Sequence, residues 1–199
     1  MNIKNFAPVT MFVGLPGCGK TTFASAIVKQ CIKKNIKVFS NVPIKGAYEY
    51  NWVDDFGYFQ NMADSIVICD EAGLDINNRD WEKNFDKEKL RFLKIIRHYH
   101  CTLIVFSQTW NDCDIKVRQM VGLLHILKKS IIPGLTVAVP VFRKIDVDEE
   151  THEFKELYYK DHPILRIFSS IHILRCKYYK MFDSWDCPSL KTKTFYKYE

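Results

Sequence analysis

The fold is decided by residues 9–22, which read Val-Thr-Met-Phe-Val-Gly-Leu-Pro-Gly-Cys-Gly-Lys-Thr-Thr. They begin with a mostly apolar run that predicts a buried β-strand, and the run ends at Gly14. A helical pattern follows the loop, and its predicted apolar face comprises Phe23, Ala24, Ile27, Val28, Cys31 and Ile32. The loop itself has the spacing Gly-x-x-x-x-Gly-Lys-Thr. Because strand, loop and helix come in the required order, the stretch predicts a phosphate-binding loop, or P-loop.

Each residue type in this loop has its own part in binding a nucleotide. Glycines 14, 17 and 19 allow backbone conformations that a Cβ atom would oppose, so that successive N–H groups can surround phosphates at the start of the helix. We expect Lys20 to bind the β- and γ-phosphates as part of the catalytic machinery, and the Thr21 hydroxyl to be a Mg²⁺ ligand. The predicted nucleotide-binding residues are Gly14, Leu15, Pro16, Gly17, Cys18, Gly19, Lys20, Thr21 and Thr22.

Two further apolar runs end in polar residues that suit phosphate chemistry. Residues 66–69 predict a buried strand, and Asp70 and Glu71 follow it, which is the arrangement of a Walker B motif. We expect Asp70 to support Mg²⁺ and Glu71 to orient or deprotonate water. Residues 102–107 predict the next strand, which ends at Gln108. That amide is a candidate for sensing the γ-phosphate, and an ordinary loop residue is the alternative.

The remaining patterns complete an α/β domain. Residues 36–43 and 122–128 predict strands, residues 86–99 and 112–121 predict helices, and residues 44–64 predict a loop and short helix against the sheet edge or, alternatively, a base-stacking surface. Two extended runs around the charged turn at residues 148–152 predict an antiparallel β-hairpin at the edge of the sheet. The expected fold is therefore a parallel sheet with helices on both faces and a hairpin extension. We expect residues 1–162 to form the core with this hairpin, and residues 163–199 a basic, aromatic appendage of the same domain.

Composition excludes several classes of protein. The chain has 199 residues, 47% of them hydrophobic, which is enough for one domain with a real core. Its seven cysteines form no C-x-x-C pair and predict reduced, mostly buried thiols rather than a disulfide framework or a zinc site. We find neither a signal peptide nor a run of about 18 apolar residues that could span a membrane, so a cytoplasmic location is expected. The net charge of +6 is weak support for nucleic-acid contact.

A family resemblance emerges from the motifs above together with three further stretches. These are Ser40-Asn41-Val42-Pro43, Arg97-His98 with Ser107-Gln108, and residues 178–184, which read Tyr-Tyr-Lys-Met-Phe-Asp-Ser. Together they resemble the zonular occludens toxin (Zot)-like ATPases of filamentous phages, which are related to the FtsK/HerA DNA-pumping motors. The likeness spans residues 8–186, nearly the whole chain.

The resemblance implies a RecA-like sheet of the additional-strand, catalytic-glutamate class, with strand order 5-1-4-3-2. It implies Mg²⁺-dependent ATP hydrolysis coupled to phage assembly or to export of a single-stranded DNA genome, in a homo-oligomeric ring such as a hexamer. A neighbouring subunit's arginine would complete the site, and Arg118 is the first candidate and Arg97 the second. Either arginine is alternatively an ordinary surface residue. Family members continue into a membrane-spanning helix and an external domain that this sequence lacks, and docking at the inner face of the bacterial membrane through a separate, membrane-bound subunit is an alternative that stays open.

Other functions stay open at this point. A small-molecule kinase also begins with a P-loop, although we find no acceptor pocket or arginine-bearing lid in the sequence. A GTPase would need an N-K-x-D guanine-reading motif, which is absent. A third alternative is an assembly switch that binds ATP with little hydrolysis. Residues 163–199 combine basic and aromatic side chains that suit single-stranded DNA, or else form a solvated tail that packs on the core.

Overall fold

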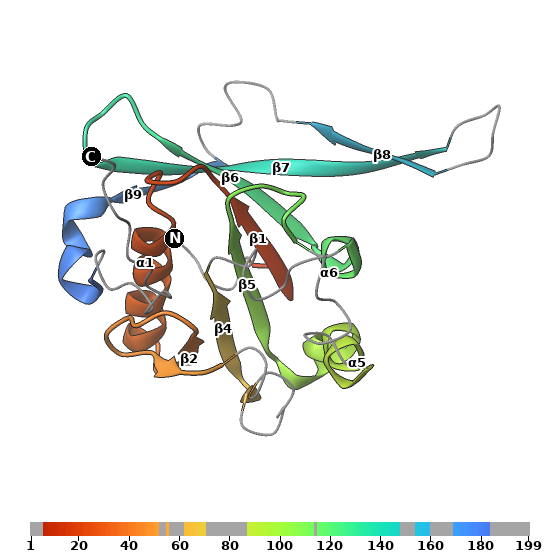
Figure 1. Ribbon diagram of the computed structural model, residues 1–199, viewed down its shortest axis with the longest axis horizontal. Coiled ribbons are helices and arrows are strands. Elements are labelled where there is room, and N and C mark those ends of the chain that lie inside the picture. The colour runs from red at the N-terminus through yellow and green to blue at the C-terminus, as the bar shows by residue number, and fades with distance from the viewer. Residues whose placement is uncertain are drawn as a thin grey trace, which may run out of the picture.

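A computed structural model describes residues 6–51, 55, 62–70, 87–113, 115–147, 154–159 and 169–183 (Figure 1). Its strands are β1 (Val9–Val13), β2 (Lys37–Ser40), β3 (Tyr48–Glu49), β4 (Ser65–Cys69), β5 (Thr102–Ser107), β6 (Leu123–Lys129), β7 (Leu135–Val147), β8 (Phe154–Tyr159) and β9 (Ile171–Leu174). Its α-helices are α1 (Lys20–Lys33), α5 (Lys87–Ile95) and α6 (Ile115–Met120), and short 3-10 helices are η2 (Ile96–Tyr99), η3 (Arg175–Lys177) and η4 (Tyr179–Met181).

The described strands form one mixed sheet in the order β3-β2-β4-β5-β1-β6-β7-β8. From β3 to β6 every neighbouring pair is parallel. With the predicted strands numbered along the chain, its central part has the order 5-1-4-3-2, which confirms the expected RecA-like sheet. The strand β5 therefore lies between the P-loop strand β1 and the acidic strand β4, as the additional strand of this class requires.

An antiparallel extension begins where the parallel part ends. Strand β7 pairs with β6 through its first half and with β8 through its second half, which confirms the predicted hairpin. Strand β9 pairs with the other edge of β7, where Thr136 lies opposite Ile173. In Figure 1 the long β7 crosses the top of the molecule, and the second half of β7, which pairs with β8, extends away from the parallel sheet.

Helices cover both faces of the parallel sheet, as predicted. Alternate residues of a strand point to opposite faces, so Val9 and Met11 of β1 join the core beneath α5 and α6, whereas Phe12 joins the core beneath α1. On the α1 side, Phe12 stacks on Phe106 of β5 and on His125 of β6, with ring centroids 5.1 and 4.7 Å apart. Burial in this apolar row lowers the pKa of His125 to about 4.

Some local predictions differ from the structure. Ile32 was expected on the apolar face of α1, but it is 50% exposed because it lies at the rim of the helix, where its side chain approaches Gly46. The predicted loop at residues 44–64 contains the short edge strand β3, which pairs with β2. The helix predicted at residues 86–99 changes to a 3-10 helix at Ile96. Glu71 lies outside the described residues.

Candidate nucleotide-binding site

The P-loop joins the carboxyl end of β1 to the start of α1, and two of its glycines adopt a conformation that other residues avoid. Gly17 has a φ of 71° and Gly19 a φ of 101°. Gly14 is required for a different reason, since a Cβ atom there would lie 2.5 Å from Cys18 Sγ. Cys18 thus fills the space beside Gly14, and burial raises the pKa of its thiol. This cysteine is therefore a packing residue of the loop.

The helix α1 begins directly after Gly19 of the P-loop. Gly19 precedes the helix and provides no side-chain cap, and no acidic residue lies in the first turn. The first N–H groups of a helix lack partners within it and attract anions. Lys20 is only 8% exposed, and its Nζ donates to the Gly14 carbonyl at 3.0 Å, which holds the ammonium across the loop. Backbone amides and a lysine therefore converge where phosphates would bind.

Strand β4 brings a carboxylate to this same place. Thr21 Oγ1 donates to Asp70 Oδ2 at 2.8 Å, so the P-loop and the acidic strand end meet directly. Asp70 is 3% exposed. Mg²⁺ prefers oxygen ligands and commonly binds through one or two protein oxygens plus substrate phosphates. The Thr21 hydroxyl and the Asp70 carboxylate fit that requirement, and they are the described residues that would hold the ion.

Asn41, just after β2, holds Asp70 in position. Its Nδ2 donates to the Asp70 carbonyl at 2.9 Å, and its Oδ1 accepts from the Asp70 N–H at 2.8 Å. Two reciprocal bonds fix the backbone that carries the carboxylate. In the sequence, the Ser40–Pro43 stretch was interpreted as the end of a predicted strand and as part of the family resemblance, and Asn41 was given no role at the site. A polar amide directly after a buried strand was the signal that could have suggested this positioning role.

The end of β5 lies beside the loop as well. The Gly14 N–H donates to the Ser107 carbonyl at 3.0 Å, so the first residue of the P-loop is tied to the last residue of β5. Gln108 is the next residue and is exposed. The structure therefore places Gln108 at the P-loop edge of the sheet, adjacent to the residue that binds Gly14.

Two residues from the antiparallel part of the sheet contact the P-loop, and neither was predicted from the sequence. Thr136, at the start of β7, is fully buried, and its Oγ1 donates to the Cys18 carbonyl at 2.9 Å. Arg175, just after β9, lies near Gly19, where a Cβ atom would be 3.3 Å from Arg175 Cδ. No local pattern could have indicated these contacts, because they depend on how β7 and β9 pair.

The two candidate arginines for a neighbouring site differ in their surroundings. Arg118 on α6 is half-buried, its Nη1 donates to Asn111 Oδ1 at 3.1 Å, and its guanidinium carbon lies 5.8 Å from the Trp110 ring centroid. Arg97 on η2 is exposed. It precedes β5 and so lies at the amino edge of the sheet, opposite the P-loop.

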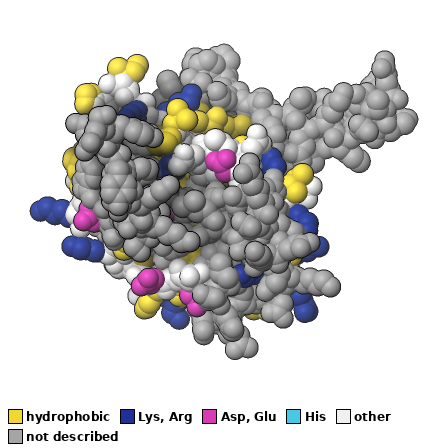
Figure 2. Space-filling model, viewed as in Figure 1, with side chains coloured by type: hydrophobic (Ala, Val, Ile, Leu, Met, Phe, Trp, Pro, Cys, Tyr) yellow, Lys and Arg dark blue, Asp and Glu magenta, His cyan; other side chains and the backbone are white. Residues whose placement is uncertain are grey.

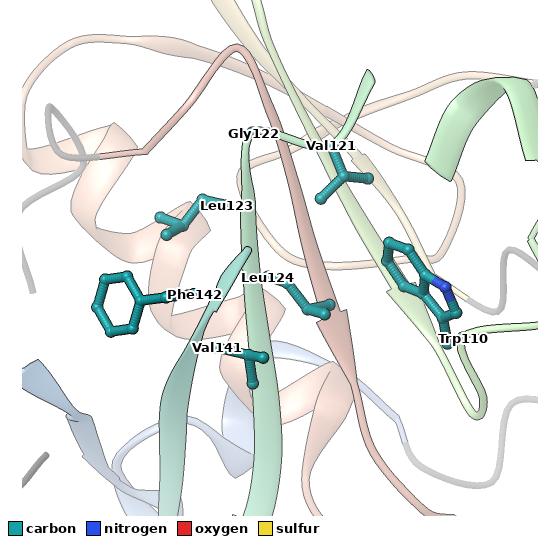
Figure 3. Close-up of a pocket in the computed structure, with 7 residues that line it drawn as sticks. All are labelled: Trp110, Val121, Gly122, Leu123, Leu124, Val141 and Phe142. Carbon is teal, nitrogen blue, oxygen red and sulfur yellow. The ribbon is translucent and has the colours of Figure 1, made fainter. Parts of the chain in front are cut away.

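A separate apolar pocket lies at the start of β6, where the pairing of β6 with β7 ends (Figure 3). Leu124 and Val141, which pair across these strands, lie on the side of Trp110, and Leu123 and Phe142 lie on the other side. Its lining includes no P-loop residue.

On the face seen in Figure 2, the described Lys and Arg side chains lie at separate places rather than in one patch. The six described cysteines are free thiols, and five of them are buried. Among the described residues, we find no helix with the length and apolar character needed to cross a bilayer.

Comparisons with known proteins agree with this geometry. The family model for the ATPases associated with various cellular activities (AAA) matches residues 10–104, which include the P-loop and Asp70. The N-terminal domain of zonular occludens toxin from Neisseria meningitidis has a similar structure, with a TM-score of 0.58 and 19% sequence identity. That likeness covers 89% of this chain and all of that domain. The chain has the fold of a Zot-like P-loop ATPase.

Two further proteins are similar to this chain. The genome packaging NTPase B204 from Sulfolobus turreted icosahedral virus 2, solved in complex with ATP-γ-S, is similar with a TM-score of 0.51 and 13% identity over 76% of this chain and 98% of that one. In sequence, an adenylate kinase isoenzyme 6 homolog from Dictyostelium discoideum is 26% identical over 125 residues, 63% of this chain. The match spans 61% of that relative's length.

Proposed function

We propose that this protein is a Mg²⁺-dependent ATPase that acts as a motor in filamentous phage assembly, on single-stranded DNA or on the assembly machinery. The observation that carries the proposal is the 2.8 Å bond between Thr21 and Asp70, which joins a P-loop to the acidic end of β4. The likeness to the Zot domain and to a viral genome packaging NTPase supports the motor role.

In this mechanism the chain's own residues bind and orient the triphosphate. The amides at the start of α1 surround the phosphates, and Lys20 leaves the Gly14 carbonyl to contact the β- and γ-phosphates. Thr21 and Asp70 would hold Mg²⁺, which neutralises charge on the phosphate oxygens when bound. Glu71 is proposed to take a proton from the attacking water, and Gln108 to orient that water near the γ-phosphate.

The proposal is tested by phosphate release from ATP with purified protein. We expect Lys20→Ala, Asp70→Asn and Glu71→Gln each to lower turnover by roughly a hundredfold or more, because each removes charge stabilisation or water activation. Lys33→Ala, in the last turn of the same helix, is the matched control and should retain wild-type turnover. Wild-type turnover in the Lys20 and Glu71 variants would refute the assignment.

The motor role requires more than hydrolysis. We expect the active form to be a ring, with Arg118 or Arg97 entering the neighbouring site, and turnover to rise when single-stranded DNA is added. Native mass spectrometry with ATP, and turnover measured with and without a DNA strand, test these points. If the protein stays a monomer, and its turnover changes neither with added DNA nor with protein concentration, the motor role is contradicted. The protein would then be an ATPase without that role.

A phosphotransferase is the second candidate, and the adenylate kinase homolog favours it. A kinase would convert ATP and AMP to ADP, whereas an ATPase releases inorganic phosphate. Incubation with ATP alone and with each nucleoside monophosphate, followed by chromatography of the nucleotides, separates the two. The strand β5 between β1 and β4 supports the ATPase, because it is the additional strand of that class. Tight ATP binding with neither product would instead indicate an assembly switch.

A further inference from the structure

Two cationic side chains besides Lys20 reach the P-loop from parts of the chain that the proposed mechanism does not use. Arg175 approaches Gly19, and Lys129, the last residue of β6, approaches Gly17, where a Cβ atom would lie 3.7 Å from Lys129 Nζ. The two side chains therefore lie at different points along the same loop. Lys129 ends the last parallel strand of the sheet, and Arg175 follows β9 of the antiparallel extension.

Topology explains why these residues arrive there. Strand β6 is parallel to β1, so its carboxyl end lies at the P-loop edge of the sheet. Strand β9 is antiparallel to β7, which is antiparallel to β6, so β9 ends at this edge too. The Arg175 N–H donates to the Gly134 carbonyl at 2.8 Å, which fixes the backbone where β9 ends. The position of Arg175 is therefore set by sheet pairing rather than by a loose terminal segment.

One hydrogen-bond donor of the Arg175 side chain is unsatisfied. Its Nε is buried and has no hydrogen-bond partner among the described residues. A guanidinium offers donors in a rigid planar fork that matches phosphate oxygens, and a buried donor without a partner is costly. Its stem already lies over the backbone just before Lys20. An anion on the loop would supply the missing acceptor.

We propose that Arg175 binds the polyphosphate of the nucleotide in cis, with Lys129 as a second, exposed cation at Gly17. This inference rests on the proposed function, because it assigns a further binding residue to the same site. It means that the phosphate site is completed by the chain's own C-terminal part, and a neighbour's arginine would act in addition. Lys20, Lys129 and Arg175 then balance a highly charged ligand that Asp70 alone would repel.

The C-terminal segment is well placed to respond to the ligand. In Figure 1 its described turns, η3 and η4, lie beside α1. Tyr178 and Met181 pack against the core beneath that helix, and Lys29 of α1 lies over the Tyr178 ring at 5.4 Å. Contact between Arg175 and phosphate would thus connect the bound nucleotide to this segment.

Binding by isothermal titration calorimetry tests the proposal with three probes, ATP, inorganic pyrophosphate and adenosine. Arg175→Met keeps an apolar stem over Gly19 and removes the charge. We expect it to weaken ATP and pyrophosphate binding roughly ten- to hundredfold, the range for a charged hydrogen bond, and to leave adenosine binding unchanged. Arg175→Lys keeps the charge without an Nε donor, and it should weaken the binding of ATP and of pyrophosphate by roughly tenfold.

Lys177→Met is the matched control, because it removes an exposed charge from the same 3-10 turn, and it should bind all three probes as the wild type does. If the wild type binds ATP and either Arg175 variant binds it with the same affinity, this inference is overturned and the proposed function is not. If the wild type itself binds neither ATP nor pyrophosphate, the proposed function fails and this inference fails with it. Equal loss of adenosine and ATP binding would show a structural role for Arg175 and would also overturn the inference.

Discussion

Replacing Asn41 by leucine tests whether the carboxylate of Asp70 depends on the clamp beside it. The change removes both side-chain bonds to the Asp70 backbone, at 2.9 and 2.8 Å. It leaves the N–H and the carbonyl of a residue that is 3% exposed without these partners. A buried group that loses its partner costs about 1–3 kcal/mol, and partial access of water to Asn41 moderates the sum to about 2–4 kcal/mol. For a chain of this size, the melting temperature should fall by about 5–15 °C.

The functional result should be specific to the metal. Because Asp70 would lose its fixed backbone, Asn41→Leu should need more Mg²⁺ for half-maximal ATP turnover, and excess Mg²⁺ should restore part of the rate. Thermal unfolding and a Mg²⁺ titration of turnover measure the two effects. Asn51→Leu is the control, since Asn51 is exposed and its backbone N–H bond to Asp55 survives the change. An Asn41 variant with the wild-type melting temperature and Mg²⁺ requirement would refute the clamp.

Three further predictions concern the loop, the core and the assembly. Thr136→Val should lose about 1–3 kcal/mol of unfolding free energy in urea titrations, because the Cys18 carbonyl loses its donor, whereas Thr136→Ser should lose much less. His125 binds a proton more readily unfolded, at its ordinary pKa of 6.5, than folded, at about 4, so stability should fall as pH drops between these values, by up to about 3 kcal/mol. His125→Leu should flatten that slope in the same titration. If Arg118 acts on a neighbour's site, mixing inactive Arg118→Ala and Lys20→Ala proteins should restore some turnover, and no gain would exclude this role.

Much of the fold could be predicted because its signals are local. The P-loop is indicated by a strand, a glycine spacing and an apolar helix face, and all three lie in one continuous stretch of sequence. The buried run before Asp70 likewise places that carboxylate at a strand end. The exposed position of Ile32 shows the limit of such patterns, because helical spacing defines a face but not how far the neighbouring chain covers it.

The rest of the site depends on contacts between distant segments. Asn41 meets Asp70 because β2 and β4 are neighbours, and the sequence of either strand alone does not reveal its partner. The same holds for Thr136, whose hydroxyl could equally have faced solvent in a different register. Pairing and register are set by the whole sheet, so residues that support the P-loop from β7 and β9 are visible only in the structure.

The antiparallel return of β7 has a consequence for how the site is built. If the strand beyond β6 were parallel to it, the chain would need a crossover connection. That connection would carry the chain away from the P-loop edge before the next strand began. Strand β7 instead returns antiparallel to β6, so that it begins at the edge where β6 ends, and β9 then ends at the same edge. Both Thr136 and Arg175 approach Gly19 for this reason. A side chain at Gly19 would meet them as well as strain the backbone, so the antiparallel extension constrains the loop that the parallel core carries.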